Sequence, residues 1–159
     1  MFDLSATFLG ADVYKAIDKI KANMREMKEG DKRFVAQISA PIYKDVIDHF
    51  KQEEGQDGQW TAWSDSYAEH MDRKGKGGNN ILQYSGRLRN AFKPTMWRRG
   101  KDGLTWFNNA KTKSGFPYAF AHNEGGDTLP KRDFMWLSDQ PLLLISQMAA
   151  RYFMFGVKE

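Results

Sequence analysis

Residues 32–52 read KRFVAQISAPIYKDVIDHFKQ, and their apolar spacing predicts the longest helix of the chain. Ile42, Val46 and Phe50 recur every four residues, which places them on one face of a helix. Pro41 lies inside this run and removes one backbone hydrogen-bond donor, so we expect a kink or two shorter helices. Such an amphipathic element needs another layer to pack against.

The sequence before this helix predicts a strand and a further helix. Residues 2–8 alternate large apolar residues with small or polar ones, which is the pattern of a half-buried strand. From residue 11 the apolar spacing changes to three and four, which predicts a helix that ends at Gly30. Two amphipathic helices joined by a short turn therefore form the N-terminal part of the expected fold.

The middle of the chain is richer in glycine and polar residues. Residues 53–80 are interpreted as a flexible Gly-rich insertion that contains one short helix over 65–73. A further helix is expected over 81–92, although Gly86 lowers its helix propensity and suggests a close approach to a neighbouring backbone.

The C-terminal part predicts a hairpin, a strand and a last helix. Asp102 followed by Gly103 lies between two aromatic runs, which predicts a β-hairpin over 95–107. Residues 129–137 are expected to be extended, and Ser138 is expected to cap a helix that reaches about residue 155.

These elements predict a single domain over residues 1–159 of the α+β class. We expect a small antiparallel β-sheet, made from the N-terminal strand, the hairpin and the strand at 129–137, packed with two N-terminal helices and a C-terminal helix. The length of 159 residues and the mass of 18.3 kDa suit one hydrophobic core.

Composition argues against several functional classes. The chain has no cysteine, which excludes disulfides, thiolate metal sites and cysteine nucleophiles. The three histidines, His49, His70 and His122, have no ligand partner at a recognisable spacing, and no nucleophile-elbow motif occurs. We therefore expect no enzyme, no metal and no cofactor. The mean hydropathy of −0.67 and the absence of a long apolar run or secretion signal predict no membrane association.

The charge is uneven along the chain. Residues 1–79 carry a net charge of −2 and residues 80–159 a net charge of +6. The excess lies in residues 87–113, where eight basic residues face one acid, Asp102. The eight are Arg87, Arg89, Lys93, Arg98, Arg99, Lys101, Lys111 and Lys113. Such a stretch is a solvated surface, a contact for an acidic protein, or a contact for nucleic acid.

Four short motifs follow one another in the second half of the chain. They read GQWTAW at residues 58–63, ILQYSGRLRN at 81–90, YAFAHNEG at 118–125 and LPKRDFMWLS at 129–138. This ordered set resembles the virion morphogenesis, or tail completion, family of tailed bacteriophages. One departure is Trp136, which stands where that family commonly has glycine.

The resemblance implies a structural protein of the head–tail junction, or neck, similar to tail terminators and completion factors. Such proteins assemble as rings, often of six copies, on the end of the tail tube and allow it to join the filled head. The implied partners are further copies of this chain, the tail tube protein and the head connector proteins. The implied location is the virion, after synthesis in the host cytoplasm, with contact to packaged DNA as a further possibility.

The motifs also supply candidate residues for subunit contacts or for holding the motif segments together. Arg87 and Arg132 could anchor two motifs by hydrogen bonds to carbonyl or carboxylate groups. The two tryptophans belong either to the core or to an interface. The full set is Trp60, Trp63, Gly86, Arg87, His122, Gly125 and Arg132.

The alternative hypothesis is a small basic nucleic-acid-binding module that uses residues 87–113. Aromatic residues interleave with its cations and could form a stacking platform, although no known nucleic-acid-binding signature occurs. The candidate contact face consists of Arg89, Arg98, Arg99 and Lys101.

Overall fold

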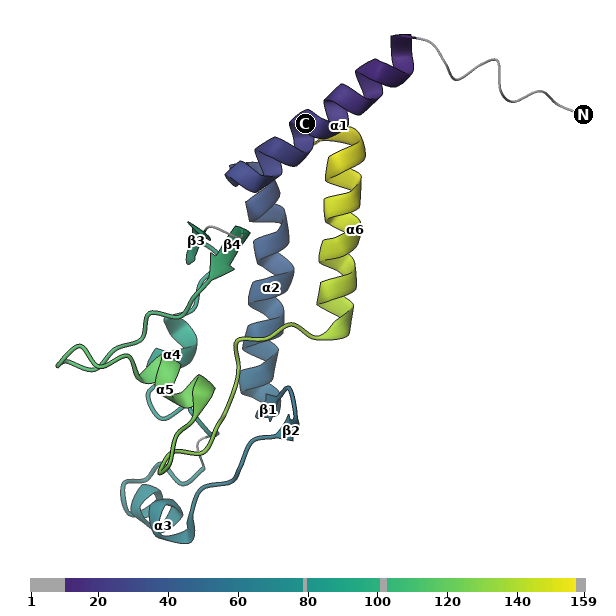
Figure 1. The fold of residues 1–159 in the computed structure, drawn as a ribbon. Coiled ribbons are helices and arrows are strands. Elements are labelled where there is room, and N and C mark those ends of the chain that lie inside the picture. The colour runs from purple at the N-terminus through teal and green to yellow at the C-terminus, as the bar shows by residue number, and fades with distance from the viewer. Residues whose placement is uncertain (1–10, 79, 101–102, 157–159) are drawn as a thin grey trace, which may run out of the picture.

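The computed structural model describes residues 11–78, 80–100 and 103–156. Pairs of helices alternate with pairs of short strands along this part of the chain (Figure 1). The helices are α1 (Ala11–Glu29), α2 (Lys32–Gln52), α3 (Asp65–Arg73), α4 (Arg87–Asn90), α5 (Tyr118–Glu124) and α6 (Asp139–Phe155). The strands are β1 (Glu54–Gly55), β2 (Gly58–Gln59), β3 (Trp97–Gly100) and β4 (Gly103–Trp106).

Helix α2 is the axis around which the other elements pack. It begins where the Asp31 carboxylate accepts hydrogen bonds from the backbone N–H groups of Arg33 and Phe34, both at 2.9 Å. It ends where Glu53 adopts a left-handed conformation with φ 56°. The helix is continuous through Pro41, so the expectation of two shorter helices is wrong. Apolar residues on both sides of the proline are buried, and this packing outweighs the lost hydrogen bond.

Two apolar clusters form on α2. Helix α6 lies alongside α2, and α1 crosses near their upper ends, whereas the β3–β4 hairpin, α4 and α5 lie on the other side of α2 (Figure 1). The larger cluster consists of Ile42, Val46, Phe50, Trp60, Leu88, Phe92, Ala110, Ala119 and Phe134. The smaller cluster consists of Phe34, Ile38 and Tyr152.

The α+β class is confirmed, with two separate two-stranded antiparallel sheets. The predicted hairpin forms β3 and β4, with Trp97 opposite Trp106. The Trp106 indole N–H donates to the Ser39 hydroxyl at 3.0 Å, which attaches the hairpin to α2. Strands β1 and β2 form the second pair and lie directly after α2.

Two expected elements are wrong. The helix expected over 81–92 is restricted to Arg87–Asn90, because Leu82 and Gly86 both have positive φ values that no α-helix accommodates. Residues 129–137 form no strand, since their N–H groups bond to α5 and not to a neighbouring strand. The Asn123 amide oxygen accepts from Phe134 and Met135, and the His122 carbonyl accepts from Arg132. The strand expected over 2–8 lies outside the described residues.

The segment 53–80 contains the β1–β2 pair and α3, and α3 has the predicted bounds. Trp60 from this segment is buried in the larger cluster, where its indole N–H donates to the carbonyl oxygen of Asp133 at 2.9 Å. Trp60 is thus a core residue. The flexibility of the segment stays a prediction.

A buried polar network joins α2 to the start of α6. The Asp45 carboxylate, 8% exposed, accepts from both the backbone N–H and the hydroxyl of Ser138 at 2.8 Å. The ring of His49, 2% exposed, lies 3.1 Å from the carbonyl oxygen of Phe134 through Nδ1 and 3.2 Å from the Ser138 hydroxyl through Nε2. Trp136 stacks on this ring at 4.2 Å between centroids, which gives this tryptophan a structural role.

We predict that Asp45→Ala lowers the free energy of unfolding by about 2–4 kcal/mol, because it leaves the buried groups of Ser138 without an acceptor. Asp48→Ala is the matched control on the same helix, and its pair with Lys51 lies at the surface. The control should cost less than about 1 kcal/mol. Urea denaturation followed by circular dichroism measures both, and equal losses would contradict this role for the network.

Candidate functional site

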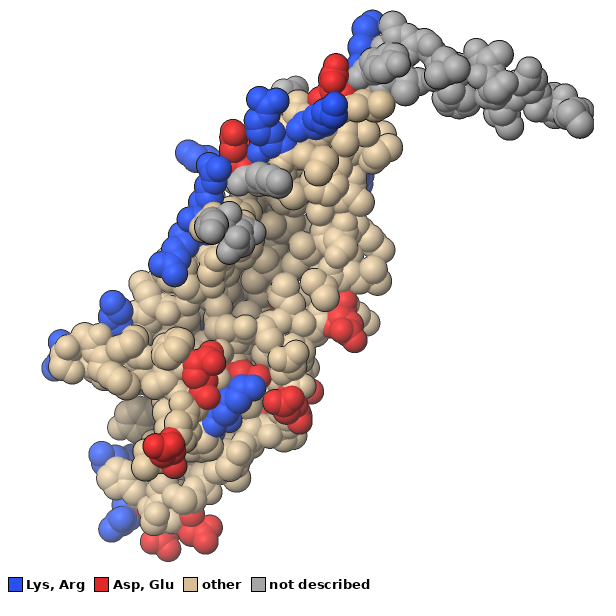
Figure 2. Space-filling view, viewed as in Figure 1, with Lys and Arg blue, Asp and Glu red and all other residues tan. Residues whose placement is uncertain are grey.

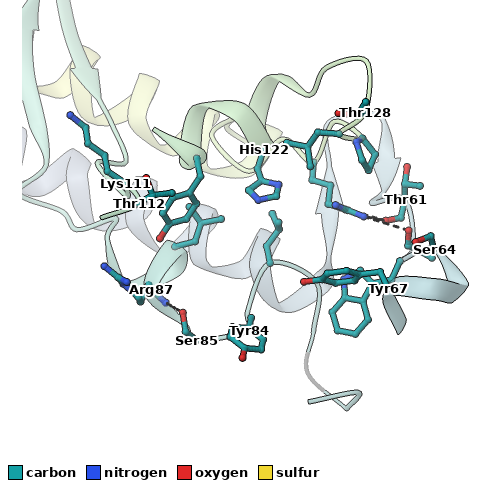
Figure 3. Close-up of a pocket in the computed structure, with 18 of the residues that line it drawn as sticks. Thr61, Ser64, Tyr67, Tyr84, Ser85, Arg87, Lys111, Thr112, His122 and Thr128 are labelled. Atoms are coloured by element: carbon teal, nitrogen blue, oxygen red, sulfur yellow. Dashed lines mark hydrogen bonds between the residues drawn. The ribbon is translucent and has the colours of Figure 1, made fainter. Parts of the chain in front are cut away.

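The four motifs converge on one cleft of about 990 Å³. The first three motifs contribute Thr61, Arg87 and His122 to its lining (Figure 3). The fourth motif contributes Arg132. Residues 111–113 complete the wall beside α4 and α5. The motifs, which are separated in sequence, therefore form one structural unit.

Arg132 fastens the fourth motif to the first. Its side chain is 7% exposed, and its Nε and Nη2 atoms donate to the carbonyl oxygen of Thr61 at 3.1 and 2.9 Å. A longer bond of 3.4 Å joins Nη2 to the carbonyl oxygen of Ala62. These bonds to carbonyl groups are of the kind expected of an anchor at Arg132. Arg87 does not share it, because its side chain is exposed at the cleft and bonds to no described residue.

His122 lies in the middle of the cleft wall, half-buried on α5 (Figure 3). Its backbone carbonyl accepts from the N–H of Arg132 at 2.9 Å, and its Nδ1 atom is buried without a partner among the described residues. Burial, and secondly the charge of Arg132, lower the pKa of His122. The imidazole is therefore held neutral at pH 7, because its ordinary pKa already lies below that pH.

Two motif glycines are required for different reasons. Gly125 has φ 74°, and a Cβ added there would lie 2.8 Å from the backbone nitrogen of Lys131. Gly86 precedes α4 with φ 68°, and a Cβ there would meet only the Asn90 amide at 3.4 Å. The close approach expected at Gly86 is thus found at Gly125, and Gly86 supplies a left-handed turn.

The candidate basic face is divided. Arg89 is half-buried on α4, where its Nη1 donates to the Gln83 side chain at 2.9 Å in a second hollow that also includes Lys51. Arg98 and Arg99 are exposed on β3, and Arg98 lies over the ring of Phe107 at 5.8 Å. Lys101 lies outside the described residues. The structure therefore separates Arg89 from the exposed pair on the hairpin.

Sequence reasoning missed the contacts of Asp45 and His49. Their spacing of four residues on α2 was a usable signal, but their partner Ser138 is distant in sequence. The trio differs from a catalytic triad, because Asp45 bonds to Ser138 and the far ring nitrogen of His49 faces a backbone carbonyl. Asp45 and His49 are buried, whereas Ser138 is half-buried.

Within residues 11–78, 80–100 and 103–156, no group of three or more His, Asp or Glu side chains is placed to hold a metal ion. None of the helices in this part of the chain combines the length and apolarity that crossing a bilayer requires. Comparison with known proteins gave no matching family model, no matching curated sequence and no matching solved structure.

We predict that Gly125→Ala lowers the free energy of unfolding by about 2 kcal/mol or more, because the new methyl group would meet the backbone at Lys131 in a left-handed conformation. Gly126→Ala is the matched control, since a Cβ there would have no atom within 4 Å. Thermal unfolding compares the two variants. Equal midpoints would show that this loop does not hold its close approach in solution.

Proposed function

We propose that this chain is a structural protein of the head–tail junction of a tailed bacteriophage, a tail completion or terminator-like subunit that assembles as a ring. The ring would sit on the tail tube and allow it to join the head connector. Its location is then the virion, after synthesis in the host cytoplasm. This proposal combines the four ordered motifs with one observation on the molecular surface.

That observation is the exposed apolar surface of α6. The helix reads DQPLLLISQMAARYFMF, with Asp139 and Arg151 as its only charged residues, yet Tyr152 is its only buried residue. A helix that is apolar around most of its circumference is normally buried. Five of its large side chains are exposed, namely Leu142, Leu143, Leu144, Met154 and Phe155. An exposed patch of this kind indicates a contact with another protein.

A second apolar surface lies on the opposite side of α2. Phe116 precedes α5 and is 56% exposed, and Phe120 on α5 is 68% exposed. In Figure 1 α5 and α6 lie on opposite sides of α2. Two different exposed apolar surfaces on opposite sides of one subunit suit a head-to-tail contact. Such a contact produces a ring when the rotation between neighbouring subunits closes on itself. A ring of six copies is the expectation from the resemblance.

A nucleic-acid-binding module remains the second candidate, because basic side chains gather over α1 and the β3–β4 hairpin (Figure 2). Arg98 and Arg99 are the exposed hairpin residues of that surface. If this function is correct, replacing both with alanine should abolish binding to short duplex DNA, and added salt should release the DNA from the unaltered protein. In a ring subunit the same replacement should leave assembly intact.

For the ring proposal we predict that Leu143→Asp weakens self-association by at least about tenfold, because the contact would bury a carboxylate. Gln37→Asp is the matched control, since it places the same charge at a polar, exposed position of α2, outside the α6 surface. Native mass spectrometry of the protein alone and with the tail tube protein of the same phage measures assembly. A monomer under both conditions would contradict the proposal.

A further inference from the structure

We propose that the cleft binds an acidic peptide segment of a partner protein, one that carries carboxylates at one end and an apolar anchor side chain at the other. The cleft contains no residue of α6. The peptide-binding proposal therefore does not depend on ring assembly. The proposal rests on unmatched charge, an apolar floor and a preformed shape.

The first observation is a group of cations without counter-charges. Arg87, Lys111 and Lys113, here called the rim cations, are exposed and line the cleft. None of the three side chains makes a hydrogen bond or ion pair within the part of the chain that the structure describes. No Asp or Glu occurs among the described residues that line the cleft. An anionic ligand would therefore meet attraction with no repulsion from the walls.

The second observation is the apolar lining between the walls. Leu82, Leu129 and Pro130 are half-buried there, and Leu88 is buried below them. Tyr118 and three other aromatic residues line the same space. The cleft volume of about 990 Å³ is ample for several side chains of a peptide. An apolar side chain of the ligand would gain free energy by leaving water at this floor.

The third observation is that hydrogen bonds join the wall segments to one another in the absence of a ligand. The buried guanidinium of Arg132 holds residues 61–62 against the fourth motif, and Asn123 holds α5 against Phe134 and Met135. A preformed cleft loses little conformational entropy on binding, which favours affinity for a short segment.

The distribution of charge favours a peptide over nucleic acid. Arg87 and Lys111 lie at one end of the cleft, whereas Thr61, Ser64 and Thr128 lie at the other (Figure 3). Arg132, the cation near that second end, is already bonded to backbone carbonyls. A nucleic acid strand needs cations along its whole path, since each nucleotide carries a phosphate. A peptide needs them only where its carboxylates lie.

The test uses an N-acetylated, C-amidated peptide of sequence Asp-Glu-Asp-Gly-Leu-Phe-Ser and isothermal titration calorimetry at low salt. We expect a Kd on the order of 10–100 µM. Two matched peptides separate the contributions: Asn-Gln-Asn-Gly-Leu-Phe-Ser lacks the carboxylates, and Asp-Glu-Asp-Gly-Ala-Ala-Ser lacks the anchor. Each should bind at least about fivefold more weakly.

Variants of the protein locate the binding. Lys111→Ala combined with Lys113→Ala should raise the Kd at least about fivefold, and Arg87→Ala should act in the same direction. Arg98→Ala combined with Arg99→Ala removes two exposed cations outside the cleft and should leave the Kd unchanged. All five positions are exposed, so these variants should fold normally.

Several outcomes would overturn the proposal. One is no measurable heat with the acidic peptide, and another is equal affinity for the peptide without carboxylates. Suppose the Kd is unchanged by the alanine replacements at Lys111 and Lys113 but rises with those at Arg98 and Arg99. That result would place the binding on the hairpin. Tighter binding of an oligo-thymidine strand, lost in the variants of the rim cations, would assign the cleft to single-stranded nucleic acid.

Discussion

The buried carboxylate of Asp45 is the constraint on which the rest of the structure depends. Buried carboxyl oxygens need hydrogen-bond partners, and Ser138 supplies one to each oxygen through its N–H and its hydroxyl. His49, one turn along α2, reaches Phe134 and Ser138 from the same helix face. These bonds fix where the chain leaves the fourth motif and where α6 begins. The network therefore fixes where α6 starts relative to α2. It thereby also fixes where the apolar residues of α6 are exposed.

The fourth motif, residues 129–138, also shapes the cleft. One stretch of chain therefore contributes to both proposed contact surfaces. Near its N-terminal end Arg132 bonds to the first motif, and in its middle the N–H groups of Phe134 and Met135 donate to the Asn123 amide oxygen. At its C-terminal end Ser138 begins α6. A ligand in the cleft and a neighbour on α6 would therefore contact the two ends of one hydrogen-bonded segment. This arrangement suits the proposed role of joining several partners.

Periodic patterns allowed the sequence to predict the long elements, whereas irregular segments were predicted poorly. The apolar spacing of α1, α2 and α6 depends only on local geometry, and an Asp-Gly pair is a local hairpin signal. The errors at 81–92 and 129–137 arose where left-handed residues and side-chain hydrogen bonds replaced regular pairing. Most of the residues that line the cleft belong to the four motifs. That these motifs come together in space could be seen only in the folded structure. The partnership of Asp45 with Ser138 spans 93 positions and has no periodic signal.

Oxidative cross-linking tests the central claim of a head-to-tail ring most directly, because the chain has no cysteine of its own. Phe120→Cys and Leu143→Cys would be combined in one chain, and each would also be made alone. If unlike faces meet, the double variant forms a ladder of disulfide-linked species that ends at one closed size, and neither single variant cross-links. Dimers from a single variant, or no cross-link in the double variant with its tail tube protein present, would contradict the account.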